Sequence, residues 1–197
     1  MSDLLKQFYQ TQQEGLLAAL SDVGLRLPDD RGMQAELKQI LLASNYAYHQ
    51  FHGKPQLLVD LIKSGDLHRV YQQSEMHKRL AKQLEGCQDA DDLSRRLRAF
   101  RHYEVLRIIW RDVNDLAKLS EIMLDMSNLA DTCITHAAAL LQKWLERSMG
   151  TPFDGQGERE KLQIIAMGKL GARELNYHQM SISFFVIQKK VKLKATM

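Results

Sequence analysis

The chain has 197 residues, of which 45% are hydrophobic, enough apolar material for the buried core of a globular protein. Its 27 basic and 24 acidic residues give a formal net charge of +3 and are spread along the whole chain, which does not describe a nucleic-acid-binding surface. No stretch approaches the ~20 apolar residues of a membrane span, and the N-terminus lacks the pattern of a signal peptide. We therefore expect a cytoplasmic protein with neither membrane nor nucleic acid as a partner.

Cysteine and histidine usage does not predict a metal site. Cys87 and Cys133 stand far apart, and neither belongs to a Cys-x-x-Cys or Cys/His spacing, so we expect two buried thiols in a reducing compartment. The 7 histidines show no metal-ligand spacing such as His-Glu-x-x-His. We predict no metal ligand among these residues.

The first three quarters of the chain read as helical. From residue 3 to about residue 147 the apolar residues recur at helical spacing, and the prolines of this region, Pro28 and Pro55, stand beside other helix breakers. The spacing predicts helices at about 3–23, 31–50, 55–64, 66–85, 90–118 and 119–149. Together they predict a helical bundle.

The helix expected at 90–118 combines an apolar stripe with a basic face. Phe100, Leu106 and Ile109 belong to the stripe, and Glu104 falls on the same side. The remaining positions are filled by arginines: Arg95, Arg96, Arg98, Arg101, Arg107 and Arg111. We expect these arginines to form a solvated cationic face, with contact to a partner protein as the alternative.

The composition changes after Met149. Residues 150–158 predict a loop, and residues 162–167 then predict a short buried strand. A turn with two glycines and a short helical stretch follow at 168–177. Glycines there let a phosphate approach backbone N–H groups, and Lys169 supplies positive charge. Because Gly-Lys-Leu-Gly has neither the Walker A nor the dinucleotide spacing, an ordinary turn stays open as an alternative.

Three stretches resemble one protein family. The run Gly-Lys-Leu-Gly-Ala-Arg-Glu-Leu-Asn-Tyr at 168–177, preceded by an apolar strand, resembles the signature of the glutamine synthetase adenylyltransferase family. Residues 97–108 resemble the family's Leu-Arg-x-Phe-Arg-Arg helix, and residues 129–134 resemble its Leu-Ala-Glu/Asp-x-x-Ile stretch. Gly-Thr-Pro at 150–152 also occupies its expected place. The resemblance covers about residues 90–177, whereas residues before 90 share only the helical character.

The resemblance implies an α/β nucleotidyltransferase domain of polymerase-β-like fold. In that fold the glycine turn holds the nucleotide phosphates, which makes Gly168, Lys169, Gly171 and Arg173 the candidate phosphate-binding residues. Two aspartates at alternating positions of the next strand hold two Mg²⁺ ions, which stabilise charge on the transferring phosphoryl group. Mg²⁺ and an adenine nucleotide are thus the implied cofactors.

The resemblance also implies a reaction and its partners. The family adds AMP to glutamine synthetase and removes it, with one nucleotidyltransferase half for each direction. Because the motif lies close to Met1, we expect the first half, in which phosphate attacks AMP attached to a tyrosine of glutamine synthetase and releases ADP. Glutamine synthetase, and the PII-type regulators to which the family responds, are the implied partners.

The sequence departs from the family after Tyr177. No aspartate or glutamate occurs from residue 178 to residue 197. The expected aspartate positions hold Met180 and Ile182, or Ser181 and Ser183 with a one-residue shift, and neither pair binds Mg²⁺ usefully. We therefore expect no retained catalytic residue and no metal ligand.

The genetic code offers an explanation for this departure. Permitted codons for residues 178–190, read one base earlier, encode Ser-Asp-Val-Asp-Phe-Ile and so restore the family's strand. We hypothesise that a frameshift near residues 177–178 produced the tail, with a genuinely divergent C-terminus as the alternative. Within the tail, Ile182 to Val186 predicts an edge strand without a partner, and the lysine-rich end predicts solvated charge rather than a nucleic-acid site.

These expectations combine into one prediction. The chain is mainly α, with a helical domain at 1–149, the start of a nucleotidyltransferase domain at 150–177 and an out-of-frame tail at 178–197. Its family function is adenylyl removal from, or addition to, glutamine synthetase in nitrogen control. We expect the chain to be truncated inside its first catalytic domain and inactive alone. The alternative is a non-catalytic helical module that binds glutamine synthetase or PII-type regulators.

Overall fold

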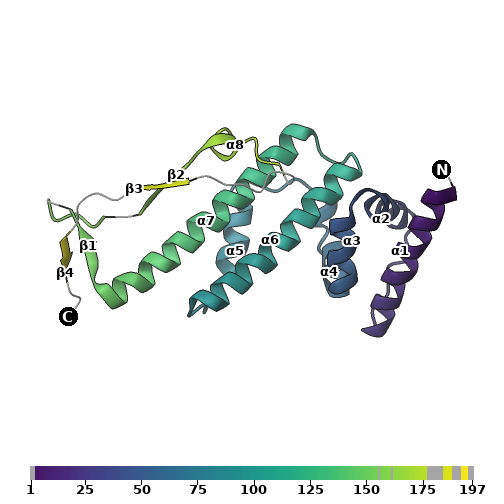
Figure 1. Ribbon diagram of the computed structural model, residues 1–197, viewed down its shortest axis with the longest axis horizontal. Helices are drawn as coiled ribbons and strands as arrows, with labels where there is room; N and C mark the ends of the chain where they lie inside the picture. Colours follow the sequence, from purple (N-terminus) through teal and green to yellow (C-terminus); the bar gives the residue numbers. More distant parts are fainter. Residues whose placement is uncertain (1–2, 155, 161, 177–183, 188–191, 195–197) are drawn as a thin grey trace. The chain divides into compact units, whose positions relative to one another are not determined.

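Most of the residues that the structure describes are helical, which confirms the predicted mainly α fold (Figure 1). The structure is a computed structural model and describes residues 3–154, 156–160, 162–176, 184–187 and 192–194. Two compact units can be distinguished, one of residues 1–72 and 101–122 and one of residues 73–100 and 123–197. The long helices α6 (Ala90–Val113) and α7 (Leu119–Met149) contribute residues to both. The domain boundary predicted at residue 150 stays a prediction.

The first unit is built from short helices whose ends are specified locally. They are α1 (Asp3–Asp22), α2 (Arg31–Ala43), α3 (Asn45–Gly53), α4 (Pro55–Ser64) and the 3₁₀ helix η1 (Asp66–His68). Asp30 caps α2 by accepting a hydrogen bond of 2.8 Å from the Met33 N–H. Pro55 begins α4, and Gly65, with φ of 72°, ends it. Leu16, Leu20, Ile40, Phe51 and Leu58 are buried in the core of this unit.

The single helix predicted at 31–50 is two helices. Ser44 has extended backbone, so its N–H still closes the last turn of α2 on the Ile40 carbonyl at 2.9 Å. The Ser44 hydroxyl oxygen accepts a hydrogen bond of 3.2 Å from the Ala47 N–H and so caps α3. A serine that serves both helix ends redirects the chain without a glycine or proline, the signals on which the prediction depended.

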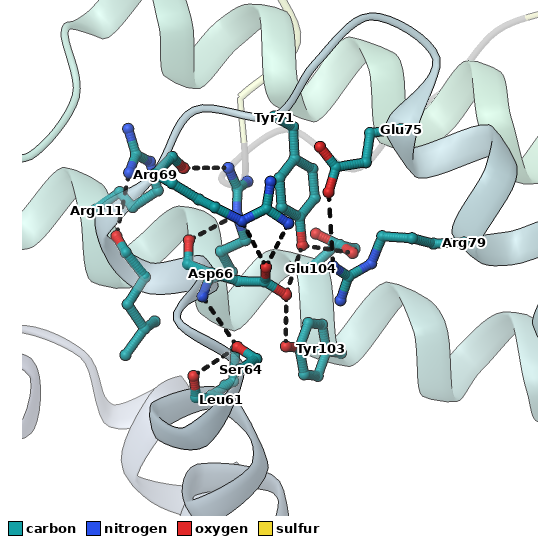
Figure 2. Close-up of polar contacts among 12 residues, drawn as sticks. Leu61, Ser64, Asp66, Arg69, Tyr71, Glu75, Arg79, Tyr103, Glu104 and Arg111 are labelled. Atoms are coloured by element: carbon teal, nitrogen blue, oxygen red, sulfur yellow. Dashed lines mark hydrogen bonds and ion pairs between the residues drawn. The ribbon is translucent and has the colours of Figure 1, made fainter.

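The helix predicted at 66–85 is also wrong over its first half. After η1 the backbone at Arg69 is extended, and a regular helix resumes only with α5 (Glu75–Gln83) in the second unit. Asp66 is 2% exposed, and polar side chains surround its carboxylate (Figure 2). Its carboxylate accepts hydrogen bonds from Arg69 at 2.7 and 3.0 Å, from the Tyr71 hydroxyl at 3.1 Å and from the Tyr103 hydroxyl at 2.9 Å.

The last two arginines of α6 are buried, which corrects the predicted cationic face. Arg107 and Arg111 are 0% and 1% exposed. Arg107 donates to the carbonyls of Asp66 and Arg69 at 3.2 Å each, and its guanidinium lies 3.6 Å from the centre of the Tyr71 ring. Arg111 donates to the Leu67 carbonyl at 3.1 Å and to Glu121 at 2.6 Å. These carbonyls accept hydrogen bonds from arginine side chains in the segment where the predicted helix is absent.

The second unit adds short strands to its helices. β1 (Thr151–Phe153) pairs antiparallel with β4 (Lys192–Lys194), and β2 (Gln163–Ala166) pairs antiparallel with β3 (Phe184–Ile187). The apolar segment predicted as an edge strand without a partner therefore has one over its described residues, because Phe184–Ile187 forms β3 (Figure 1). Cys87 and Cys133 are half-buried thiols, not the fully buried ones expected.

The helices α1 to α8 include long ones, but none that the structure describes has both the length and the apolar composition needed to cross a membrane.

Candidate nucleotide-binding site

The predicted turn lies at the end of strand β2. β2 ends at Ala166, Met167 is extended, and α8 (Gly168–Gly171) begins directly after it. Gly168 has φ of 58°, a left-handed conformation that glycine adopts without steric cost. The chain can therefore turn from β2 into α8 within one residue. Gly168 and Lys169 are exposed at this turn.

Gly171 is required by a close approach between α8 and β2. A Cβ atom at this position would lie 2.7 Å from the Ala166 carbonyl oxygen and 3.3 Å from its carbon. Both are backbone atoms and cannot move aside as a side-chain end can. The second glycine of the turn thus has a packing role, whether or not a phosphate binds nearby.

The two basic candidates have different surroundings. The Lys169 side chain is exposed, on the first turn of α8. Arg173 follows α8 with φ of 59°, and its guanidinium donates to Asp131 on α7 at 2.8 Å and to Asn128. The carboxylate of Asp131 offsets the charge of Arg173, so an incoming phosphate would compete with it for the guanidinium.

A second contact holds the same segment on α7. The Leu175 N–H donates to the hydroxyl of the buried Ser127 at 3.3 Å, and both Leu170 and Leu175 are buried. Ser127, Asn128 and Asp131 were not predicted as site residues. Their sequence signals are a group of polar residues at helical spacing in α7 and, for Asp131, its place in the stretch at 129–134 that resembles the family.

The residues that the structure describes include no cluster of metal-binding side chains. Among them, no group of three or more histidine, cysteine, aspartate or glutamate side chains is arranged to hold a metal ion. Asp131, a carboxylate near the turn, is paired with Arg173. The positions at which family aspartates were expected, Met180, Ser181, Ile182 and Ser183, lie outside the described residues.

Comparison with known proteins finds a matching family and several similar enzymes. Residues 34–191 match the family described as glutamate-ammonia ligase adenylyltransferase. The chain is 42% identical over 123 residues to a bifunctional glutamine synthetase adenylyltransferase/adenylyl-removing enzyme of Nitrosococcus oceani, and 38% identical over 142 residues to the enzyme of that name from Pseudomonas aeruginosa. The matches cover 62% and 72% of this chain. A third enzyme of that name, from Shewanella loihica, is 32% identical over 175 residues, or 88% of this chain.

The relatives are much longer than this chain. The matched region spans 13% of the Nitrosococcus protein, 14% of the Pseudomonas protein and 18% of the Shewanella protein. Likeness over so short a part identifies a family but does not transfer the activity of the whole enzyme. On the extent of the family match, the chain belongs to the glutamate-ammonia ligase adenylyltransferase family.

Proposed function

We propose that this chain supplies the phosphate-binding turn, and the helices on which it rests, of an enzyme that transfers adenylyl groups to or from glutamine synthetase. The observation that carries the proposal is the geometry of residues 163–171. A strand leads into a left-handed glycine, and a second glycine lets α8 approach β2, so that Lys169 stands exposed at the turn. An exposed lysine beside accessible glycine backbone suits the phosphates of an adenine nucleotide.

Lys169 has the principal electrostatic role in this proposal, and Arg173 has a positioning role. Arg173 is engaged by Asp131 and Asn128, so its charge is already partly compensated. The pair is half-exposed, which makes its contribution to stability small. The pair instead has an orienting role, because it holds the segment after α8 against α7 and so keeps the turn at the end of β2.

The chain alone is not proposed to catalyse adenylyl transfer. Family chemistry depends on paired carboxylates that hold Mg²⁺, and residues 178–197, where that pair is expected, contain no aspartate or glutamate. Purified chain mixed with adenylylated glutamine synthetase, phosphate and Mg²⁺ should therefore release no ADP above background. Robust ADP release would refute this part of the proposal.

Nucleotide binding tests the turn directly. Titration calorimetry with ADP should show binding to the chain, and Lys169→Ala should weaken it about tenfold or more, because a charge-assisted hydrogen bond is lost. Lys143→Ala on α7 is the matched control, since it removes the same charge from an exposed position away from the turn. Absence of ADP binding, or equal weakening by both variants, would contradict a specific phosphate site.

A non-catalytic module is the second candidate, and the absence of aspartate and glutamate from residue 178 to residue 197 of the sequence favours it. In that case the helices bind glutamine synthetase or a PII-type regulator without turnover. Surface plasmon resonance against each purified protein separates the two functions. A measured affinity for either one, together with no response to ADP, favours the module.

The origin of the tail remains a separate proposal. We propose that residues 178–197 are out of frame, which DNA sequencing through codons 170–200 tests. A restored frame should encode Ser-Asp-Val-Asp after Tyr177. The family match extends to residue 191, beyond the proposed shift, so a divergent C-terminus stays open as the alternative.

A further inference from the structure

A cavity lies between α1 and α2, in the compact unit that does not contain the glycine turn. The two helices pack against each other, and the segment that joins them lines one side of the cavity (Figure 1). Its volume of about 580 Å³ is within the range of about 300–1,000 Å³ that pockets for small molecules occupy. Most of its lining residues precede residue 34, where the family match begins, so the family resemblance assigns no role to this cavity.

The inner wall of the cavity is apolar. It is formed by leucines of α1 and α2 that are at most 6% exposed: Leu16, Leu20, Leu37 and Leu41. The half-buried Leu25 and Leu27 of the joining segment extend this wall toward solvent, and Tyr9 adds an aromatic ring to it. An apolar group placed against such a wall is removed from water and can pack on the Tyr9 ring. The wall therefore suits a ligand with a large apolar body.

Two opposite charges line the same cavity. Arg26 and Asp29 belong to the joining segment, and both side chains are exposed. Within the described part of the chain, neither side chain has a hydrogen-bond or ion-pair partner. A guanidinium binds a carboxylate through two parallel hydrogen bonds, and a carboxylate accepts hydrogen bonds from an ammonium group. Together the two side chains match a small molecule that carries both charges.

The segment that carries these charges is held at both ends. Gly24 follows α1 with φ of 69°, and the next N–H, that of Leu25, donates to the Leu20 carbonyl at 2.8 Å. Next to α2, the Gln34 side-chain amide donates to the Pro28 carbonyl at 3.5 Å. Because these contacts fix the segment before a ligand arrives, less ordering is needed when the ligand binds.

We propose that the cavity between α1 and α2 binds a free amino acid with a large apolar side chain. Arg26 binds the α-carboxylate, Asp29 binds the α-ammonium group, and the leucine wall encloses the side chain. A simple anion would meet the carboxylate of Asp29 and a simple cation the guanidinium of Arg26, so a like charge disfavours each of them. The inference is independent of the nucleotide role, because the glycine turn belongs to the other compact unit.

Titration of the isotope-labelled chain with L-phenylalanine, followed by two-dimensional NMR, tests the inference. Amide signals of residues 24–29 should shift and then saturate. Arg26→Gln and Asp29→Asn should each weaken binding about fivefold to tenfold, because each removes one charge-assisted contact. Both side chains are exposed, so circular dichroism should show that both variants fold. Arg31→Gln and Asp60→Asn are the matched controls, since these exposed charges of the same unit do not line the cavity, and they should leave the affinity unchanged.

Ligand analogues assign the two charges separately. Hydrocinnamate lacks the ammonium group and phenethylamine lacks the carboxylate, so each should bind about fivefold to tenfold more weakly than L-phenylalanine. Asp29→Asn should not weaken hydrocinnamate further, and Arg26→Gln should not weaken phenethylamine further. Glycine, which has both charges and no apolar body, should bind at least about tenfold more weakly.

Four results would overturn the inference. They are the absence of saturable binding of L-phenylalanine, equal effects of the cavity variants and their controls, further weakening of either analogue by the variant that lacks its missing contact, and binding of glycine as tight as that of L-phenylalanine.

Discussion

Replacing Asp66 with alanine should be among the most destabilising single changes in the first unit. The carboxylate is 2% exposed and accepts hydrogen bonds from Arg69, Tyr71 and Tyr103 at 2.7 to 3.1 Å. Each hydrogen bond to a charged group contributes about 1.5–3 kcal/mol, but part of this returns because Arg69 is half-exposed and gains water. We expect a net loss of about 3–5 kcal/mol, as for other buried pairs that lose one member.

Urea unfolding followed by circular dichroism measures this loss. The thermal midpoint should fall by about 6–20 °C, given about 2–4 °C per kcal/mol for a chain of this size. Asp60→Ala is the matched control, because Asp60 is an exposed helical aspartate that accepts a single hydrogen bond of 2.7 Å from Gln56. It should change stability by no more than about 0.5 kcal/mol. Tyr103→Phe should cost about 1.5–3 kcal/mol alone and less than that in Asp66→Ala. If Asp66→Ala is as mild as Asp60→Ala, the buried network does not stabilise the fold as argued.

Three further predictions follow from single features of the structure. Burial lowers the pKa of His136 from 6.5, and so does His77, whose ring centroid lies 5.5 Å from that of His136. The free energy of unfolding should therefore decrease as the pH falls from 6.5 through that lowered pKa. His77→Gln should move the pKa of His136, measured by NMR titration, part of the way back. Gly171→Ala should cost about 1–3 kcal/mol, because its Cβ would lie 2.7 Å from the Ala166 oxygen, and should accelerate amide exchange in β2 and α8. Ser44→Ala should cost about 1 kcal/mol in urea unfolding through loss of the α3 cap.

Each of these has a control that uses the same chemistry. His136→Gln should remove its share of the pH dependence, and an unchanged profile would contradict the assignment to His136. Gly53→Ala adds a methyl group with no atom within 4 Å, so it should not reproduce the effect of Gly171→Ala. Ser44→Asp keeps a capping oxygen and should retain most of the stability that Ser44→Ala loses.

Local sequence signals predicted the features that depend on neighbouring residues. Helical spacing of apolar residues predicted most of the helices, and Pro55 and the glycines marked several of their ends, because these residues restrict the backbone wherever the chain folds. The strand before Gly168 and the turn after it followed from composition in the same way, but β2 is partly exposed and not buried as predicted. The family resemblance, based on short contiguous motifs at about 90–177, was confirmed. The match is wider than predicted, since it covers residues 34–191 and so includes residues before 90, where only the helical character was expected to be shared.

Tertiary structure decided where the charged residues of α6 and α7 lie. By spacing alone Arg107 and Arg111 belong to a polar face, yet both are buried because carbonyls some 40 positions earlier, at 66, 67 and 69, accept their hydrogen bonds. The sequence likewise did not predict the partner of Arg173, because Asp131 is 42 residues away in the chain. A polar side chain can be buried only where distant groups satisfy it, so its burial depends on contacts between segments far apart in the chain. Helical periodicity indicates which side of a helix a residue occupies, and only the folded chain supplies the groups on that side.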